Sequence, residues 1–204
     1  MTRRQFAVRS AAVFSTAAAL NARGFEQAEG QELIGKPAPP LALKEWLNSK
    51  PLDIPDLRGK VVLLRWWTEG CPYCTATAPA LAGLERTYES RGLQLIGIFH
   101  PKPPGEWTVE KVRRAAEEKH FAFPIAVDGD WTALKRWWLT KDRNFTSVSF
   151  LVDRNGIIRY IHPGGEFHEG RQGGMPTHEA CNRDMHFIQR EIAKRLTPMH
   201  ATAL

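Results

Sequence analysis

The sequence predicts an α/β domain with a central mixed β-sheet flanked by helices and an N-terminal extension. The continuous apolar run at residues 61–64 and the mostly apolar segment Leu93–Phe99 are typical of buried strands. A helical pattern lies between them, which favours parallel pairing because parallel strands need a long crossover connection. Further on, D-R-N-G at 153–156 lies between two short apolar segments and predicts an antiparallel hairpin.

The composition is that of an ordinary globular protein and excludes some classes of function. The 204 residues are 43% hydrophobic and 25% charged, enough for one domain with a sizeable core. The net charge is +6, but three arginines lie in the first 22 residues; without them 25 basic residues face 22 acidic ones, or +3. With no clustered basic stripe, we expect no nucleic-acid partner.

The N-terminus has the pattern of an export signal. Residues 1–22, MTRRQFAVRSAAVFSTAAALNA, pair Arg3 and Arg4 with an alanine-rich run. This is typical of a twin-arginine signal, and cleavage after Ala22 would leave residues 23–204 as the folded domain. We therefore expect a periplasmic or otherwise exported protein, in a compartment where a close cysteine pair can form a disulfide.

The first half of the domain reads as an entry segment followed by β-α-β. Residues 23–50 contain GKPAPPLAL, whose three prolines favour extended chain. After the strand at 61–64, Pro72 stands at a good first helical position, and a helix should run to about residue 90 with a kink at Pro79. The strand at Leu93–Phe99 is followed by a loop, HPKPPGEW.

The second half continues the alternation and ends in the hairpin and a last helix. Thr108 can cap a helix through His120. A short strand at 122–128 and a short helix at 131–139 should precede hairpin strands at 147–152 and 157–161. A glycine-rich loop covers 163–176, and Thr177 can cap the final helix, whose apolar residues recur at helical spacing.

Cys71 and Cys74 form a C-x-x-C motif at a strand-to-helix turn. The first cysteine of such a motif lies at the helix N-terminus, where N–H groups and the helix dipole stabilise a thiolate. Cys71 is thus the candidate nucleophile, and Cys74, one turn inside, can resolve a mixed disulfide. A zinc site and a purely structural disulfide remain alternatives. Structural zinc usually needs two ligand pairs, and the chain has three cysteines.

The chain resembles the TlpA/ResA branch of the thioredoxin superfamily, within the redoxin family. The resemblance rests on these segments between residues 33 and 165: IGKPAPPLAL, LRGKVVLLRWWTEGCPYC, GLQLIGI, FPIAVD and FLVDRNGIIRYIHPGG. It implies a thioredoxin fold and an exported thiol–disulfide oxidoreductase with a redox-active Cys71–Cys74 disulfide and no required cofactor. It also implies a protein thiol or disulfide substrate and a membrane dithiol reductant as partners, with Trp67, Tyr73 and Ser147 at the substrate-binding surface.

Three positions depart from the family pattern. Gly70 replaces a tryptophan before the first cysteine, Thr77 replaces a glutamate, and Ser147 replaces a cis-proline. A cis bond before serine is not expected, since the non-proline cis form costs about 2.5–4 kcal/mol. The Ser147 hydroxyl could instead face the two sulfurs as a hydrogen-bond donor.

Two other chemistries stay open. A peroxiredoxin-like peroxide reductase is suggested by Thr68 ahead of Cys71, although Leu64 stands where that motif has proline. Glu69 is a candidate proton carrier for Cys74, or else a solvated loop acid. His100, after the second buried strand, is a further candidate for substrate contact.

The last alternative is a copper- or zinc-handling protein that uses the cysteine pair and a histidine-rich loop. Histidine and cysteine suit both metals. Cys181 also falls on the apolar stripe of the last helix, so it can equally be a small core residue. The candidate ligands are His162, His168, His178 and Cys181.

Overall fold

The computed structural model describes residues 29–140, 142–170 and 179–197. The predicted export signal, residues 1–22, and the predicted caps and ligands at Thr177 and His178 lie outside these ranges. Within them, no helix combines the length and apolar character needed to cross a membrane.

The described residues contain one six-stranded mixed sheet, in the order β1-β4-β3-β2-β5-β6. Strand β2 pairs in parallel with β3, and β3 with β4, whereas β1–β4, β2–β5 and β5–β6 are antiparallel. The predicted parallel core and late hairpin are therefore confirmed. The strands are β1 (Trp46–Leu47), β2 (Val61–Trp67), β3 (Leu93–Phe99), β4 (Ile125–Val127), β5 (Ser149–Val152) and β6 (Ile158–His162).

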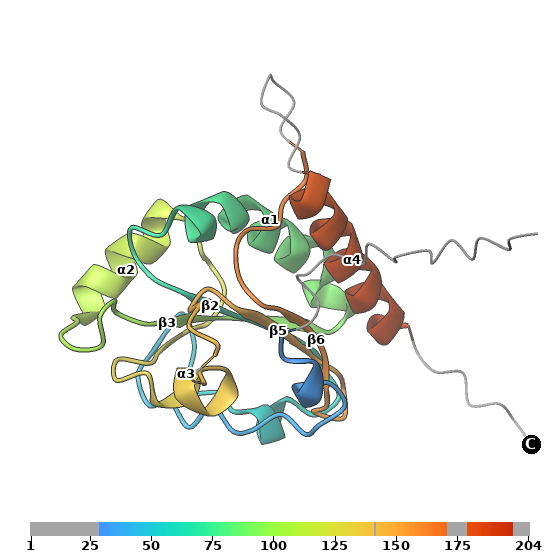
Figure 1. Ribbon diagram of the computed structural model, residues 1–204, viewed down its shortest axis with the longest axis horizontal. Coiled ribbons are helices and arrows are strands. Elements are labelled where there is room, and N and C mark those ends of the chain that lie inside the picture. Colours follow the sequence, from blue (N-terminus) through green and yellow to red (C-terminus); the bar gives the residue numbers. More distant parts are fainter. Residues whose placement is uncertain (1–28, 141, 171–178, 198–204) are drawn as a thin grey trace, which may run out of the picture.

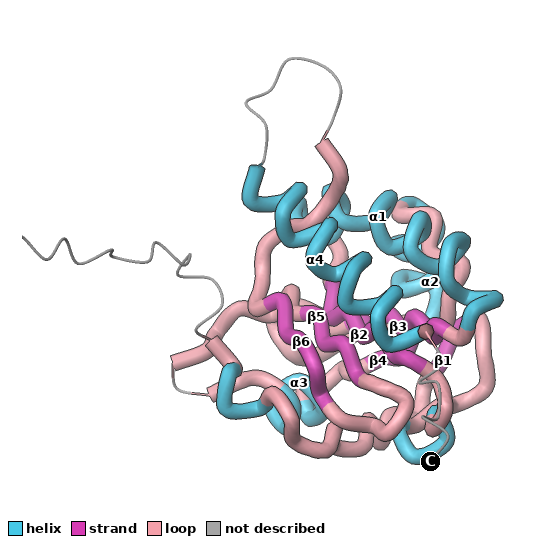
Figure 2. Tube along the Cα trace, turned by 90° about the vertical axis from the view of Figure 1, so that its right-hand side faces the viewer, coloured by secondary structure: helices cyan, strands magenta, loops and turns pink. Residues whose placement is uncertain are grey.

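Helices cover both faces of this sheet (Figures 1 and 2). On one face lie α1 (Pro72–Tyr88), α2 (Val109–Glu118) and α4 (Glu179–Leu196), and on the other lies α3 (Thr132–Trp137). Each face has its own hydrophobic core. Strand β2 is buried throughout, and its alternate side chains enter the two cores, so Leu63 faces α1 while Leu64 faces α3.

The sequence predicted which helices and strands exist better than it predicted the residues at which they begin and end. The short strand β1 was missed, because two residues within an extended, proline-rich segment give no periodic signal. Helix α2 ends at Glu118 rather than His120, which has a left-handed backbone with φ 55°. Strand β4 and helix α3 are shorter than expected, and α1 continues through Pro79 to Tyr88.

The four tryptophans of the two W-W pairs are core residues. Trp66 packs against Trp137 with ring centroids 5.6 Å apart, and Trp67 packs edge-on against Phe99 at 5.1 Å. This burial fixes β2 between the two helical layers, and the end of β2 delivers the chain to the C-x-x-C turn.

Candidate active site

Cys71 is the N-cap of α1, and the local sequence explains why. Gly70 has φ 65°, a left-handed conformation that a side chain would strain, and it turns the chain from β2 into the helix. Pro72 then occupies the first helical position, where its missing N–H costs nothing. The Cys74 N–H donates to the Cys71 Sγ over 3.2 Å, so the sulfur itself caps the helix.

The two thiols differ in environment. Cys71 is half-buried at the surface, while Cys74 is buried beneath it, and both are free thiols. A hydrogen bond from Cys74 is the main cause that lowers the pKa of Cys71 to about 5. The same hydrogen bond and burial raise the pKa of Cys74 well above the usual value. At neutral pH the pair therefore holds one proton, on Cys74, and one thiolate, on Cys71.

Ser147 completes the sulfur environment. Its Oγ lies 3.4 Å from the Cys71 Sγ and 3.3 Å from the Cys74 Sγ. The predicted orientation of this hydroxyl toward both sulfurs is confirmed. Among the described residues the cis peptide bond is Lys102–Pro103, so Ser147 follows a trans bond, as expected for serine. The hydroxyl lowers the pKa of Cys71 by stabilising the thiolate.

Arg65 is a functional candidate that the sequence reading missed. It is only 1% exposed and lies on the α1 face of β2. Its guanidinium donates to the Ser149 Oγ at 3.2 Å and to the Gly165 carbonyl at 2.9 Å, and stacks over Phe167 at 5.6 Å. Burial lowers its pKa, and its positive charge favours the thiolate forms of both cysteines. The sequence did contain a signal for this role, because Arg65 is a charged residue in a strand predicted to be buried on both faces.

An open cleft of about 640 Å³ leads to Cys71. Two exposed aromatic side chains flank it, Tyr73 with 46% and Phe145 with 52% of its surface accessible. Ser147 and Lys102 also line this cleft. Exposed aromatic rings beside a reactive sulfur suit contact with another polypeptide. The sequence reading identified Tyr73 and Ser147 but not Phe145.

Several other predicted positions have different roles. Trp67 is 0% exposed and packs beneath the helix, so the prediction that it contacts substrate is wrong in this conformation. His100 is likewise fully buried, against Trp131, and cannot reach a docked substrate. Glu69 lines the cleft, but its carboxylate pairs with Lys111 at 2.6 Å; proton transfer by Glu69 stays a prediction.

The candidate metal ligands are only partly brought together. Among the described residues, the one group of three or more candidate ligand side chains is Glu166, His168 and Cys181, and neither Cys71 nor Cys74 belongs to it. His162 lies apart from that group, with its Nε2 3.4 Å from Asp184. Burial, with the neighbouring carboxylates of Glu166 and Asp184, raises the pKa of Cys181 to about 11. The described part of the histidine loop forms no single site with the cysteine pair, and His178 lies outside the described residues.

Comparison with known proteins supports the resemblance seen in the sequence. The model of the AhpC/TSA family matches residues 34–161. The chain is 31% identical to protein DipZ of Mycobacterium bovis over 122 residues, which are 58% of this chain and 17% of DipZ. It is 25% identical to thiol-disulfide oxidoreductase ResA of Bacillus cereus over 136 residues, 67% of this chain and 73% of ResA.

Solved structures confirm the thioredoxin-like fold. A thiol-disulfide isomerase from Corynebacterium glutamicum superposes with a TM-score of 0.58 at 22% identity, covering 80% of this chain and 97% of that one. The chain spans less than a fifth of the length of the first curated relatives it matches, at 17% of DipZ.

Proposed function

The chain belongs to the AhpC/TSA family, and from this premise we propose that it is an exported thiol–disulfide oxidoreductase that exchanges disulfides with a partner protein. The observation that best supports this is the asymmetry of the Cys71–Cys74 pair. One sulfur is accessible with a lowered pKa, and the other is buried, protonated and within hydrogen-bonding reach of the first. Attack and resolution require this division of roles.

The exchange begins at Cys71. Its thiolate attacks one sulfur of a substrate disulfide, forming a Cys71–substrate disulfide and releasing the other substrate sulfur as a thiolate that takes up a proton. Cys74 then loses its proton and attacks the Cys71 Sγ. The mixed disulfide breaks, a Cys71–Cys74 disulfide forms, and the second substrate thiol leaves. Two electrons pass from the dithiol to the substrate, and no dissociable cofactor is required.

The cleft supplies the proposed substrate surface. Tyr73 and Phe145 flank the nucleophile, and Ser147 stands where the family has its substrate-docking proline. A trans serine keeps a hydroxyl beside both sulfurs that proline would lack. We expect the partner polypeptide to lie across these side chains in extended form.

Export and regeneration complete the proposal. The Arg3-Arg4 pair and alanine-rich run of residues 1–22 support a twin-arginine signal and a periplasmic location. There a membrane dithiol reductant would return the Cys71–Cys74 disulfide to the dithiol. Fusion of residues 1–30 to a reporter that is active only after export tests this, with Arg3→Lys/Arg4→Lys as the variant expected to block export.

A trapping experiment tests the proposed reaction. The Cys74→Ser variant should accumulate a mixed disulfide with a disulfide-containing peptide, seen as one added peptide mass at Cys71. The Cys71→Ala variant should form none, while Cys181→Ala should turn over like the unmodified chain. Trapping at Cys181, or none at Cys71, would overturn the proposal.

Peroxide reduction is the second candidate, favoured by one observation. Thr68 lines the same cleft as Cys71, and its buried Oγ1 has no hydrogen-bond partner among the residues that the structure describes. Cys71 would attack a peroxide oxygen to give a sulfenic acid and water or an alcohol, and Cys74 would condense with it, releasing water. If Cys71 reacts faster with hydrogen peroxide than with a peptide disulfide, and Thr68→Ala slows only the peroxide reaction, this candidate replaces the first.

A further inference from the structure

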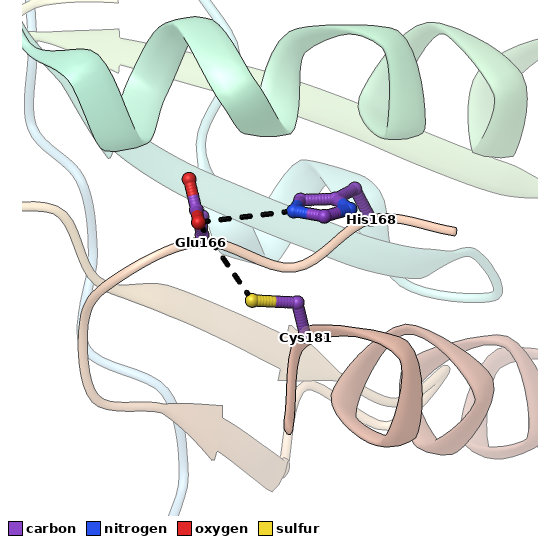
Figure 3. A group of neighbouring side chains, drawn as sticks. All are labelled: Glu166, His168 and Cys181. Carbon is purple, nitrogen blue, oxygen red and sulfur yellow. Dashed lines mark hydrogen bonds and ion pairs between the residues drawn. The ribbon is translucent and has the colours of Figure 1, made fainter. Parts of the chain in front are cut away.

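Figure 3 shows that Glu166, His168 and Cys181 converge, and neither Cys71 nor Cys74 belongs to this group. Glu166 and His168 lie in the loop after β6, and Cys181 lies on α4. The Glu166 Oε1 is 3.8 Å from both the His168 Nε2 and the Cys181 Sγ, and the three ligand atoms all lie within 4.8 Å of one another. The AhpC/TSA match ends at residue 161, so these side chains belong to a part of the chain that the family match does not cover.

The histidine is oriented as a metal ligand would be. Its Nδ1 lies 3.0 Å from the Glu169 carbonyl oxygen, which can only accept, so Nδ1 carries the hydrogen. In the neutral ring the lone pair is then on Nε2, the nitrogen that faces Glu166. A second-sphere hydrogen bond of this kind fixes the tautomer and ring plane of histidines that bind metals.

The donor spacing is close to that of a tetrahedral zinc site. Zinc bonds of about 2.0–2.3 Å place neighbouring tetrahedral donors roughly 3.3–3.5 Å apart. Two of the three donor pairs here are 3.8 Å apart, so they need to close by only a few tenths of an ångström. The third pair, the His168 Nε2 and the Cys181 Sγ, lies within 4.8 Å and has to close by up to about an ångström more. His168 and Cys181 are largely buried, which limits competition from bulk water.

A cavity of about 430 Å³ reaches two of the three proposed ligands, Glu166 and Cys181. Glu166, Cys181 and Asp184 line it, together with Tyr73 and Phe145 at the edge of the dithiol cleft. A cation could enter from this side, and water or the Asp184 carboxylate could supply a fourth ligand. Glu166, Asp184 and a Cys181 thiolate would together place enough negative charge there to balance a divalent cation.

We propose that Glu166, His168 and Cys181 bind Zn²⁺ at a site independent of the Cys71–Cys74 pair. Zinc accepts this mixed set of carboxylate oxygen, imidazole nitrogen and thiolate sulfur, whereas Cu(I) prefers softer sulfur donors. Binding joins the loop after β6 to α4. The same loop holds Gly165, whose carbonyl receives the Arg65 guanidinium, so the metal would brace the loop that covers this buried cation.

The test uses the full chain as a Cys71→Ser/Cys74→Ser variant, which removes the dithiol as a competing ligand. After chelation and dialysis, Zn²⁺ titration should give one bound ion per chain. Loss of an outer-sphere partner alone costs roughly 10–100-fold in metal affinity, so His168→Ala or Cys181→Ser in this background should cost at least as much. His186→Ala is the matched control, since His186 is exposed on the same helix, and should leave affinity unchanged.

Co²⁺ substitution gives a readout specific to the proposed ligands. A thiolate-to-cobalt charge-transfer band should appear in the Cys71→Ser/Cys74→Ser variant and vanish on adding Cys181→Ser, with circular dichroism confirming the fold. Glu166→Gln is a second variant that preserves shape and should weaken binding. Absence of zinc binding in the dithiol-free variant, binding insensitive to His168→Ala and Cys181→Ser, or binding of Cu(I) without Zn²⁺ would each overturn the proposal.

Discussion

Cys71 and Cys181 have opposite electrostatic surroundings. Hydrogen bonds from Cys74 and Ser147, with the Arg65 cation, favour a thiolate at Cys71. Burial and two carboxylates favour a thiol at Cys181. The loop after β6 separates the two environments, because the Gly165 carbonyl accepts from Arg65 while the next residue, Glu166, faces Cys181.

This difference teaches that the chemistry of a cysteine here depends on its neighbours rather than on burial alone. Burial by itself raises the pKa of both thiols. At Cys71 the hydrogen bonds outweigh it, and the thiolate form is favoured near neutral pH. At Cys181 the carboxylates add to it, so the thiolate would need a cation beside it.

The largest effect should come from removing the nucleophile. Cys71→Ala should abolish disulfide exchange with a peptide substrate, because no other sulfur is both accessible and ionised near neutral pH. Cys181→Ala should retain most of the activity. Stopped-flow measurement of peptide thiol release compares the two, and comparable losses in both variants would contradict the separate roles assigned to these thiols.

The next largest effect is in the pH dependence of alkylation. The thiolate fraction rises with pH through the pKa, so Cys71 should become reactive around pH 5 and Cys181 only around pH 11. The readout is the pH at which the alkylation rate of each thiol reaches half its maximum. The rate itself is not compared, because burial also slows the alkylation of Cys181. Mass spectrometry of the reduced, chelator-treated chain after iodoacetamide pulses would measure both. If Cys71 and Cys181 were alkylated with the same midpoint pH, the two thiols would not have the opposite surroundings described above.

A smaller change should follow Ser147→Ala. The variant loses a hydroxyl that contacts both sulfurs, so the pKa of Cys71 should rise. A hydrogen bond to a charged group contributes about 1.5–3 kcal/mol, and a change of one in pKa corresponds to about 1.4 kcal/mol. Because this thiol is only half-buried, we expect the lower end of that range, which is a rise of about one in the pKa of Cys71. Thiolate absorbance against pH gives the value, and Thr87→Ala, exposed on α1, is the control.

The smallest expected change at Cys71 is that of Arg65→Met. This variant keeps much of the side-chain volume and removes the buried positive charge, so the pKa of Cys71 should rise, by less than in Ser147→Ala. Arg86→Met, an exposed change far along α1, should have no effect. The same absorbance titration applies, and an unchanged Cys71 pKa in Arg65→Met would show that the buried cation does not act on the dithiol.

Local sequence chemistry was sufficient for much of the fold. The D-R-N-G turn formed as predicted because the Asp153 carboxylate accepts from the N–H groups of Asn155 and Ile157, and Gly156 takes φ 70°. The C-x-x-C turn and the direction of the Ser147 hydroxyl were likewise predictable from nearby residues and from resemblance. These features depend on few residues and on strong backbone preferences.

What could not be predicted depends on which long-range neighbours meet. The strand period places Arg65 on the same face as Leu63, but only the packing of α1 and of the loop at Gly165 shows that this face contains the sulfurs. Trp67 shares that face, and its burial excludes it from substrate contact. Glu166 and Cys181 meet although they are 15 residues apart, and the glycine-rich sequence between them has no periodic pattern from which this contact could be predicted.

Redox equilibration of residues 23–204 in dithiol–disulfide buffers tests the central claim most directly. We expect one reversible two-electron couple that is unchanged in Cys181→Ala and absent in both Cys71→Ala and Cys74→Ala. A chain with no reversible couple, or a couple that persists without Cys71, would contradict the assignment of Cys71 and Cys74 as an exchanging dithiol.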